Sequence, residues 1–322
     1  AIGEMKAAND VLVRIRTADG IVGIGEACPF PPITGETQET NLAAARALRN
    51  IFLGKDALAA LSLYKEIGAI SHSNPSMVAA FDTAIFDILG KMAGLPLFRL
   101  FGGSDPSFET DITTGIDTPE KVAESASAHV ARGYKTLKIK LGTDPDTDIA
   151  RIQAVRRAVG DSIDLRIDAN QGWTVPQAIH ALDGLAQYRI EFVEQPVVAS
   201  DVSGMATVRA HSKIPVMADE SLFLPPDSIK LIKAEACDYF NIKLMKAAGI
   251  MNMMRIAHTA DAAHVVASQP NIVFADLDGN AEHSIDPIIG GMTVKNGIIT
   301  LPEKPGLGCD VDPAFLKKQR KV

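Results

Sequence analysis

The sequence predicts an α/β protein in which an α+β unit precedes a (β/α)8-type barrel. From Phe108 onward, short strand-like runs alternate with amphipathic helical stretches, which indicates a parallel sheet. The polar residues that end these runs recur at steps of 26, 25 and 24 residues, from Asp168 through Glu194 and Asp219 to Lys243. Even steps favour a barrel over a doubly wound sheet. In such barrels the catalytic groups lie at the carboxyl ends of the strands.

The first hundred residues predict strands followed by helices. VLVRIRT and IVGIGEA alternate apolar and polar residues around Asp19-Gly20, which is a hairpin pattern. Ser73-Asn74-Pro75 then places a capping residue and a first-turn proline before an apolar-periodic helix that continues to Ala93 and closes at Gly94.

The barrel is one strand short of eight. Seven runs are visible: FETDITTGI, TLKIKLG, DLRIDAN, EFVEQP, PVMADES, YFNIKLM and IVFADLD. Two units at this spacing need about 50 residues between Lys243 and Asp276, which leaves a deficit of roughly 17. MNMMRIAHTADAAHVVAS fills the interval as one helical pattern. A true deletion would expose unpaired strand edges, so we expect the natural protein to carry further residues near Ala260 and Asp261.

Composition limits the classes of partner and compartment. A formal net charge of −7 without clustered Lys and Arg excludes a nucleic-acid partner and favours a small-molecule substrate. No apolar run approaches the ~20 residues of a membrane span, and we expect no signal peptide. Three cysteines without CxxC spacing predict a reducing compartment, the cytoplasm.

Three carboxylates form the candidate metal site. Asp168, Glu194 and Asp219 end successive strands, so in a barrel they would converge on one mouth and repel each other without a hard cation between them. Mg2+ is the cation that suits such ligands. Any one of these residues could equally be an ordinary helix cap, but three at matched spacing favour the metal.

Lysines supply the candidate proton-transfer groups. Lys138 and Lys140 alternate onto one face of the second run, which should be the barrel interior, and Lys243 ends the sixth run across the mouth. A metal flanked by lysines can bind a carboxylate and stabilise an enediolate while one lysine removes an α-proton and the other returns it. Without the carboxylates, the KxK pair would indicate only a basic strand.

Two further acids close the last run. Asp276 and Asp278 have same-face spacing, and an ammonium group is their natural partner. A solvated turn before Gly279 explains them equally well.

Together these motifs resemble the enolase superfamily, muconate-lactonizing subgroup, over nearly the whole chain. The resemblance rests on KIK at 138–140, RIDANQGW at 166–173, VEQP at 193–196, ADES at 218–221 and NIKLMK at 241–246. It implies a capping domain of residues 1–105 and a tail of 285–322 that returns to it, over a catalytic barrel of 106–284. It also implies residue roles. Lys140 and Lys243 would be the two bases, and Lys138 would be the neighbour that sets the pKa of Lys140. The ligands of one Mg2+ per subunit would be Asp168, Glu194 and Asp219, supported by Asn170 and Glu220.

Two features resemble the dipeptide epimerases within that subgroup. PPITGET at 31–37 is similar to their mobile capping loop, with Ile33 and Thr34 facing substrate, and Asp276 with Asp278 matches the DxD that receives a dipeptide's free amino group. The resemblance implies epimerisation at the C-terminal residue of a dipeptide, in a homo-oligomer. Gly3 stands where members acting on Ala-Glu tend to carry a basic residue, so acidic and uncharged C-terminal residues both stay open.

Other reactions fit the same metal and lysines. N-acylamino acid racemases, o-succinylbenzoate synthases and muconate cycloisomerases use carboxylate substrates without a free ammonium group. A non-catalytic, metal-dependent binding protein is the alternative from a different class, if the barrel truly lacks its seventh strand.

Overall fold

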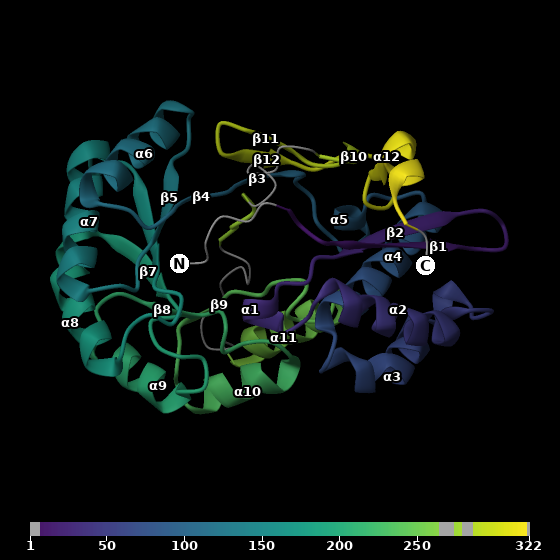
Figure 1. The fold of residues 1–322 in the computed structure, drawn as a ribbon, viewed down its shortest axis with the longest axis horizontal. Helices are drawn as coiled ribbons and strands as arrows, with labels where there is room; N and C mark the ends of the chain where they lie inside the picture. The colour runs from purple at the N-terminus through teal and green to yellow at the C-terminus, as the bar shows by residue number, and fades with distance from the viewer. Residues whose placement is uncertain (1–6, 264–273, 279–285, 321–322) are drawn as a thin grey trace.

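The computed structural model describes residues 7–263, 274–278 and 286–320. Figure 1 shows two parts, an arc of parallel strands covered by helices α6 to α10 and, on the opposite side, a capping part built from a hairpin and helices α2 to α4. Gly3 and the predicted helical pattern beyond Ala263 lie outside the described residues. No helix in the described part of the chain is long and apolar enough to cross a membrane.

The capping part begins with the predicted hairpin and the predicted long helix. Its elements are β1 (Val11–Arg16), β2 (Val22–Ala27), α1 (Pro31–Thr34), α2 (Gln38–Phe52), η1 (Ala57–Ala59), α3 (Ala60–Ser71), α4 (Pro75–Ala93) and α5 (Leu97–Leu100). As predicted, Asn74 occupies the N-cap position of α4, Pro75 opens the helix and Gly94 ends it at φ 68°. The Asn74 side chain makes no capping bond, and the buried Glu36 accepts from the Ser76 backbone N–H at 3.2 Å instead.

Helix α4 lies unusually close to strand β2. A Cβ on Gly25 would lie 1.9 Å from the Ala80 carbonyl oxygen, so only glycine permits this approach. Asp87, fully buried on α4, accepts hydrogen bonds from the backbone of Ile24 at 3.0 Å and of Leu307 at 2.8 Å. The helix therefore joins the hairpin to the C-terminal tail.

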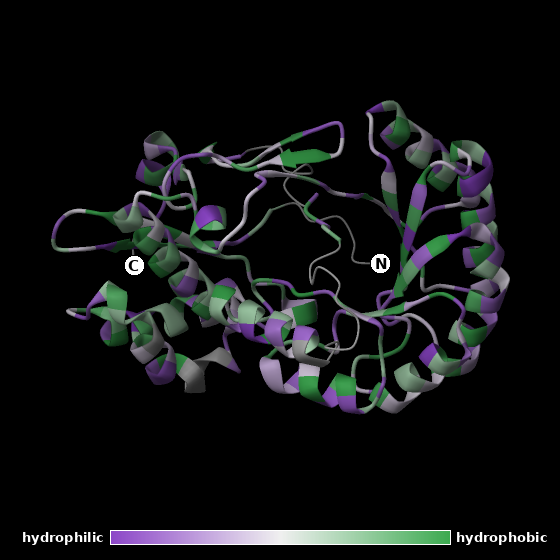
Figure 2. Cartoon of the chain, turned by 180° about the vertical axis from the view of Figure 1, so that it is seen from behind, coloured by the Kyte–Doolittle hydropathy of each residue, from purple (hydrophilic) through white to green (hydrophobic). Residues whose placement is uncertain are grey.

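The barrel sheet has six parallel strands among the described residues, paired in chain order. They are β4 (Ile112–Thr114), β5 (Thr136–Lys140), β6 (Asp164–Asp168), β7 (Ile190–Glu194), β8 (Val216–Ala218) and β9 (Tyr239–Phe240). The outer helices are α6 (Pro119–Ala131), α7 (Pro145–Val159), α8 (Val175–Leu185) with η2 (Ala186–Tyr188), α9 (Val202–His211), α10 (Pro225–Lys233) and α11 (Ile250–Ala263). Hydrophobic and hydrophilic residues alternate along these helices, as expected of a layer with one face on the core (Figure 2).

Three predicted strands need correction. FETDITTGI is two strands, because β3 (Ser107–Glu109) pairs antiparallel with β12 while β4 joins the barrel. YFNIKLM stops being a strand at Phe240, so Lys243 lies in the following turn. In IVFADLD, the described residues 274–278 form no strand. The ring of Phe274 packs instead against Phe192 and Tyr239, with centroids 5.0 and 5.2 Å apart.

Helix α11 runs unbroken through Ala260 and Asp261. This agrees with the predicted helical pattern as far as Ala263, and no strand interrupts residues 250–263. The expected additional residues at this place stay a prediction.

The tail carries β10 (Ile288–Gly290), β11 (Thr293–Lys295), β12 (Ile298–Thr300), β13 (Cys309–Val311) and α12 (Pro313–Lys318). Strand β12 pairs with both β11 and β3, and β10 pairs with β13. The tail thus contacts the start of the barrel through β3 and the capping helix α4 through Leu307. Cys28, Cys237 and Cys309 are free thiols, consistent with the expected lack of a disulfide framework.

Candidate active site

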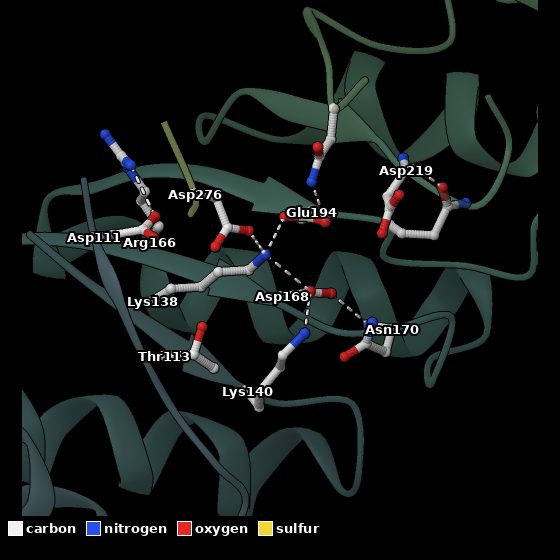
Figure 3. A network of polar contacts seen from close by, with 12 residues as sticks. Asp111, Thr113, Lys138, Lys140, Arg166, Asp168, Asn170, Glu194, Asp219 and Asp276 are labelled. Atoms are coloured by element: carbon white, nitrogen blue, oxygen red, sulfur yellow. Dashed lines mark hydrogen bonds and ion pairs between the residues drawn. The ribbon is translucent and has the colours of Figure 1, made fainter. Parts of the chain in front are cut away.

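Three carboxylates meet at the carboxyl ends of adjacent strands, as predicted (Figure 3). Asp168 is the last residue of β6 and pairs in register with Glu194, the last residue of β7. Asp219 follows β8 directly. Their exposed fractions are 0, 1 and 2%, so three acidic groups are withdrawn from water at one place.

Lysine ammonium groups contact all three carboxylates. Lys138, 2% exposed, lies 2.8 Å from Glu194 and 3.4 Å from Asp168. Lys140 donates to Asp168 at 2.6 Å, and Lys243 donates to Asp219 at 2.6 Å. The KxK pair therefore faces the interior as predicted, and the two outer lysines approach the acidic cluster from β5 and from the turn after β9.

Burial and neighbouring charges determine the electrostatics of this cluster. Burial, reinforced by the Asp168 charge, raises the pKa of Glu194 to about 8. Burial disfavours the ammonium form of Lys138, but Glu194 and Asp168 outweigh it and hold the pKa of Lys138 well above its usual range. Asp219 likewise outweighs burial at Lys243 and raises the pKa of that lysine to about 12. The cluster thus favours bound positive charge.

The donor set fits a divalent cation. Among the residues that the structure describes, no three His, Cys, Asp or Glu side chains stand ready to hold a metal directly, since lysine ammonium groups lie against the carboxylates. The chemistry of the donors nonetheless suits Mg2+, which prefers carboxylate oxygens. Beside them, Glu220 Oε2 is buried without a hydrogen-bond partner, and burial raises the pKa of Glu220. A buried carboxylate oxygen without a hydrogen-bond donor is one that a cation would satisfy.

Asn170 and Glu220, the predicted supports of the carboxylates, lie beside the acidic cluster. The Asn170 backbone N–H donates to Asp168 Oδ1 at 2.8 Å, and its side-chain amide donates to Glu220 Oε1 at 3.2 Å. Asn170 adopts φ 41°, a left-handed conformation that asparagine tolerates better than most residues. The turn after β6 therefore links two of the acidic residues.

The DxD segment crosses the mouth, and its two acids have different partners. Asp276 accepts from Lys138 at 2.6 Å, whereas Asp278 accepts from the Thr113 backbone N–H at 2.7 Å. Burial raises the pKa of Asp276, but Lys138 outweighs it and lowers that pKa below its ordinary value. Arg166 donates to the Ala275 carbonyl at 3.1 Å, which holds the segment from below.

Within the described part of the chain, the hydrogen bonds of Ile33 and Thr34 are local and do not reach the acidic cluster. They form the end of α1, and the Thr34 hydroxyl bonds the backbone of Phe30 and Glu36. The predicted capping loop is therefore a short helical turn, and contact with substrate by these two residues stays a prediction.

Comparisons with known proteins identify the family. Residues 1–102 match the model "Mandelate racemase / muconate lactonizing enzyme, N-terminal domain", and residues 121–267 match "Enolase C-terminal domain-like". This chain belongs to the enolase superfamily. The predicted barrel with an α+β capping domain is confirmed by solved structures of enolase-superfamily enzymes that match it over nearly its whole length.

Relatives within the enolase superfamily act on amino-acid derivatives. A hydrophobic dipeptide epimerase of Enterococcus faecalis is 38% identical over 96% of this chain and 93% of that protein. A dipeptide epimerase of Cytophaga hutchinsonii, solved with Mg and the dipeptide D-Ala-L-Val, has a TM-score of 0.91 at 36% identity and covers 97% of this chain and 91% of that one. An N-succinyl-L-Arg/Lys racemase of Bacillus cereus is 33% identical over 96% of this chain and 89% of that protein.

Three residues of this enolase-superfamily site were missed by the sequence analysis. Asn241 donates to Glu194 at 2.8 Å, and Gln195 accepts from the Asp219 backbone at 2.9 Å. The Lys246 ammonium contacts both Asp219 Oδ1 and the Asp219 carbonyl. Gln195 and Asn241 are close in sequence to predicted site residues, and Lys246 is part of the motif NIKLMK. Their closeness to the end of a strand was the signal that could have marked them as site residues.

Proposed function

We propose that this chain is a Mg2+-dependent dipeptide epimerase that inverts the α-carbon of a dipeptide's C-terminal residue by proton transfer between two lysines. The observation that carries the proposal is the arrangement of Lys140 and Lys243. They lie on β5 and after β9, four strands apart in the sheet, and each bonds a different carboxylate of one cluster at 2.6 Å. Groups so placed can serve opposite faces of one carbon.

The assigned roles follow from charge and position. Asp168, Glu194 and Asp219 would hold the metal, with Asn170 and Glu220 supporting them. When bound, Mg2+ supplies the positive charge that stabilises a carboxylate as its α-proton leaves. Lys243 would return a proton in its ammonium form and remove one in its neutral form. Lys138, wedged between Asp168 and Glu194, supplies fixed positive charge next to Lys140.

The DxD segment supports a substrate with a free amino group. Asp276 and Asp278 place two carboxylates near the acidic cluster, and an ammonium group is the partner that such carboxylates bind most strongly. A dipeptide carries that ammonium group at one end and the carboxylate for the metal at the other. Its C-terminal α-carbon would then lie between the two lysines.

The test is α-proton exchange in D2O with Mg2+ present, followed by NMR, on L,L-dipeptides with acidic, apolar and basic C-terminal residues. We expect exchange with inversion at the C-terminal residue, and the ranking of the panel would define the specificity that Gly3 leaves open. A folded, metal-loaded sample that exchanges none of the dipeptides would contradict the proposal.

A second candidate is racemisation of an N-acylated amino acid, which the likeness to the N-succinyl-L-Arg/Lys racemase favours. Asp278→Asn separates the two reactions, because an N-acylated amino acid has no free α-amino group to lose as a partner, whereas a dipeptide does. For a dipeptide epimerase we expect the KM to rise and kcat/KM to fall by about 10- to 100-fold, the cost of a charge-assisted bond of roughly 1.5–3 kcal/mol. Unchanged kcat/KM on dipeptides would instead favour the acylated substrate.

A further inference from the structure

A third lysine at the metal-ligand cluster, Lys246, has no role in the reaction as described so far. It follows β9 by six residues, in the same turn as Lys243, and the Ala247 backbone N–H closes this turn onto the Lys243 carbonyl at 2.9 Å. The turn thus directs two ammonium groups at one carboxylate, that of Asp219.

The two lysines hold Asp219 in different ways. Lys243 contacts only Oδ2, and 40% of its side chain is exposed. Lys246 contacts Oδ1 and the main-chain carbonyl of the same residue, and 3% of its side chain is exposed. A group that binds both the side chain and the backbone of one residue restricts rotation of that side chain.

The burial of Lys246 makes its contact permanent. Removing one partner from a buried ion pair leaves an uncompensated charge in the protein interior. Lys243 has access to solvent and can leave Asp219 at a smaller cost. The Lys246 ammonium also lies 5.5 Å from the centre of the Phe223 ring, which adds a cation–π contact to its ion pair with Asp219.

From this geometry we propose that Lys246 is a positioning residue that fixes the orientation of the Asp219 carboxylate for metal binding, so that Oδ2 stays directed toward the site while Lys243 is free to act. The inference rests on the assignment of Asp219 as a metal ligand under the proposed function. It does not depend on the identity of the substrate.

The test measures metal binding without any substrate. Mn2+ binding to the purified, metal-depleted full chain would be followed by electron paramagnetic resonance for wild type, K246M and K246R. Loss of a residue that orients a ligand typically lowers metal affinity by about 10- to 100-fold, which is the expected result for K246M. K246R keeps the positive charge and the hydrogen-bond donors, so we expect Mn2+ affinity nearer to wild type than to K246M.

Controls separate orientation from charge and from folding. K135M removes an exposed lysine of an exposed ion pair and should leave Mn2+ affinity unchanged. If circular dichroism shows K246M unfolded, K246Q, which keeps a neutral amide donor, replaces it, and we expect its Mn2+ affinity to be lower than that of wild type. Binding of Mn2+ by a folded K246M or K246Q as tight as wild type, or tighter, would overturn the proposal, because Lys246 would then merely offset charge. Wild type that binds Mn2+ but exchanges no dipeptide would contradict the proposed function and leave this inference standing.

Discussion

Lys140 and Lys243 occupy equivalent positions on either side of the acidic cluster, and both keep access to solvent. Their side chains are 27 and 40% exposed, whereas Lys138 between them is 2% exposed. A group that accepts and returns protons must be able to leave its ion pair. A group that only supplies charge can stay in its ion pair throughout. Under the proposed function, this difference in burial is the one expected between two proton carriers and one fixed cation.

Replacement of either carrier should abolish epimerisation but leave one half-reaction. In Lys140→Met and Lys243→Met we expect epimerisation to fall by about 10²- to 10⁴-fold, the usual contribution of a general acid or base. Each variant should still exchange the α-proton of one epimer in D2O, with retention, and the two variants should prefer opposite epimers. NMR on both epimers checks this, with Lys121→Met on the exposed face of α6 as control. The same preferred epimer in both variants would contradict a two-face mechanism.

The sequence predicts which carboxylates meet better than it predicts what contacts them. Asp168, Glu194 and Asp219 could be placed because the carboxyl ends of parallel strands meet, whatever the loops do. Lys246 could not, because its partner is fixed by the course of a turn after β9 that has no periodic pattern. The separate partners of Asp276 and Asp278 were equally hidden, since they depend on how residues 274–278 pack rather than on their spacing.

At the level of elements, the contact between β2 and α4 depends on glycine. The VGIGEA strand places Gly23 and Gly25 against α4, where a Cβ would meet the carbonyl oxygens of Ala84 and Ala80 at 2.0 and 1.9 Å. Backbone atoms of a helix cannot yield as a flexible side chain can. The hairpin must therefore move away if either glycine gains a side chain.

Gly25→Ala should lower the free energy of unfolding by about 1–3 kcal/mol or more, the usual cost of overpacking a core. Urea denaturation followed by circular dichroism measures it. Gly115→Ala is the matched control, because a Cβ there has no atom within 4 Å and the residue is exposed. Equal stability of the two variants would show that α4 and β2 can separate without loss.

Elements with regular periodicity were predicted well, and those that depend on a distant partner were not. The hairpin, α4 and the strands β5 to β8 follow from local alternation and capping. The split of FETDITTGI into β3 and β4 could not be foreseen, because β3 pairs with a distant strand, β12. The paired residues Phe108 and Ile299 are 191 positions apart in the chain. The described residues of IVFADLD have the composition of a strand, but the Phe274 ring packs among Phe192, Tyr239 and Arg166.

At the level of the whole molecule, α4 joins the capping part to the barrel side through one buried acid. Asp82 on α4, 3% exposed, accepts a hydrogen bond from the backbone N–H of Ile250 at the start of α11. Tyr64 on α3 donates to the Ala248 carbonyl at 2.8 Å beside it. The domain boundaries at 105 and 284, the homo-oligomeric state and the cytoplasmic location stay predictions.

This joint should make stability depend on pH. Burial raises the pKa of Asp82 from 3.8 to about 7, so between these values the folded protein holds a proton that the unfolded chain has released. The stabilisation is complete below about pH 4 and is lost as pH rises toward 7, by at most about 4 kcal/mol at 1.36 kcal/mol per pH unit. Asp82→Asn should remove this decline, because a neutral amide can accept from Ile250 at every pH. Urea denaturation of both proteins from pH 5 to 8 measures the difference between their free energies of unfolding. This difference should grow with pH in favour of Asp82→Asn and level off above pH 7. A difference that stays constant with pH would mean that Asp82 does not titrate in the joint.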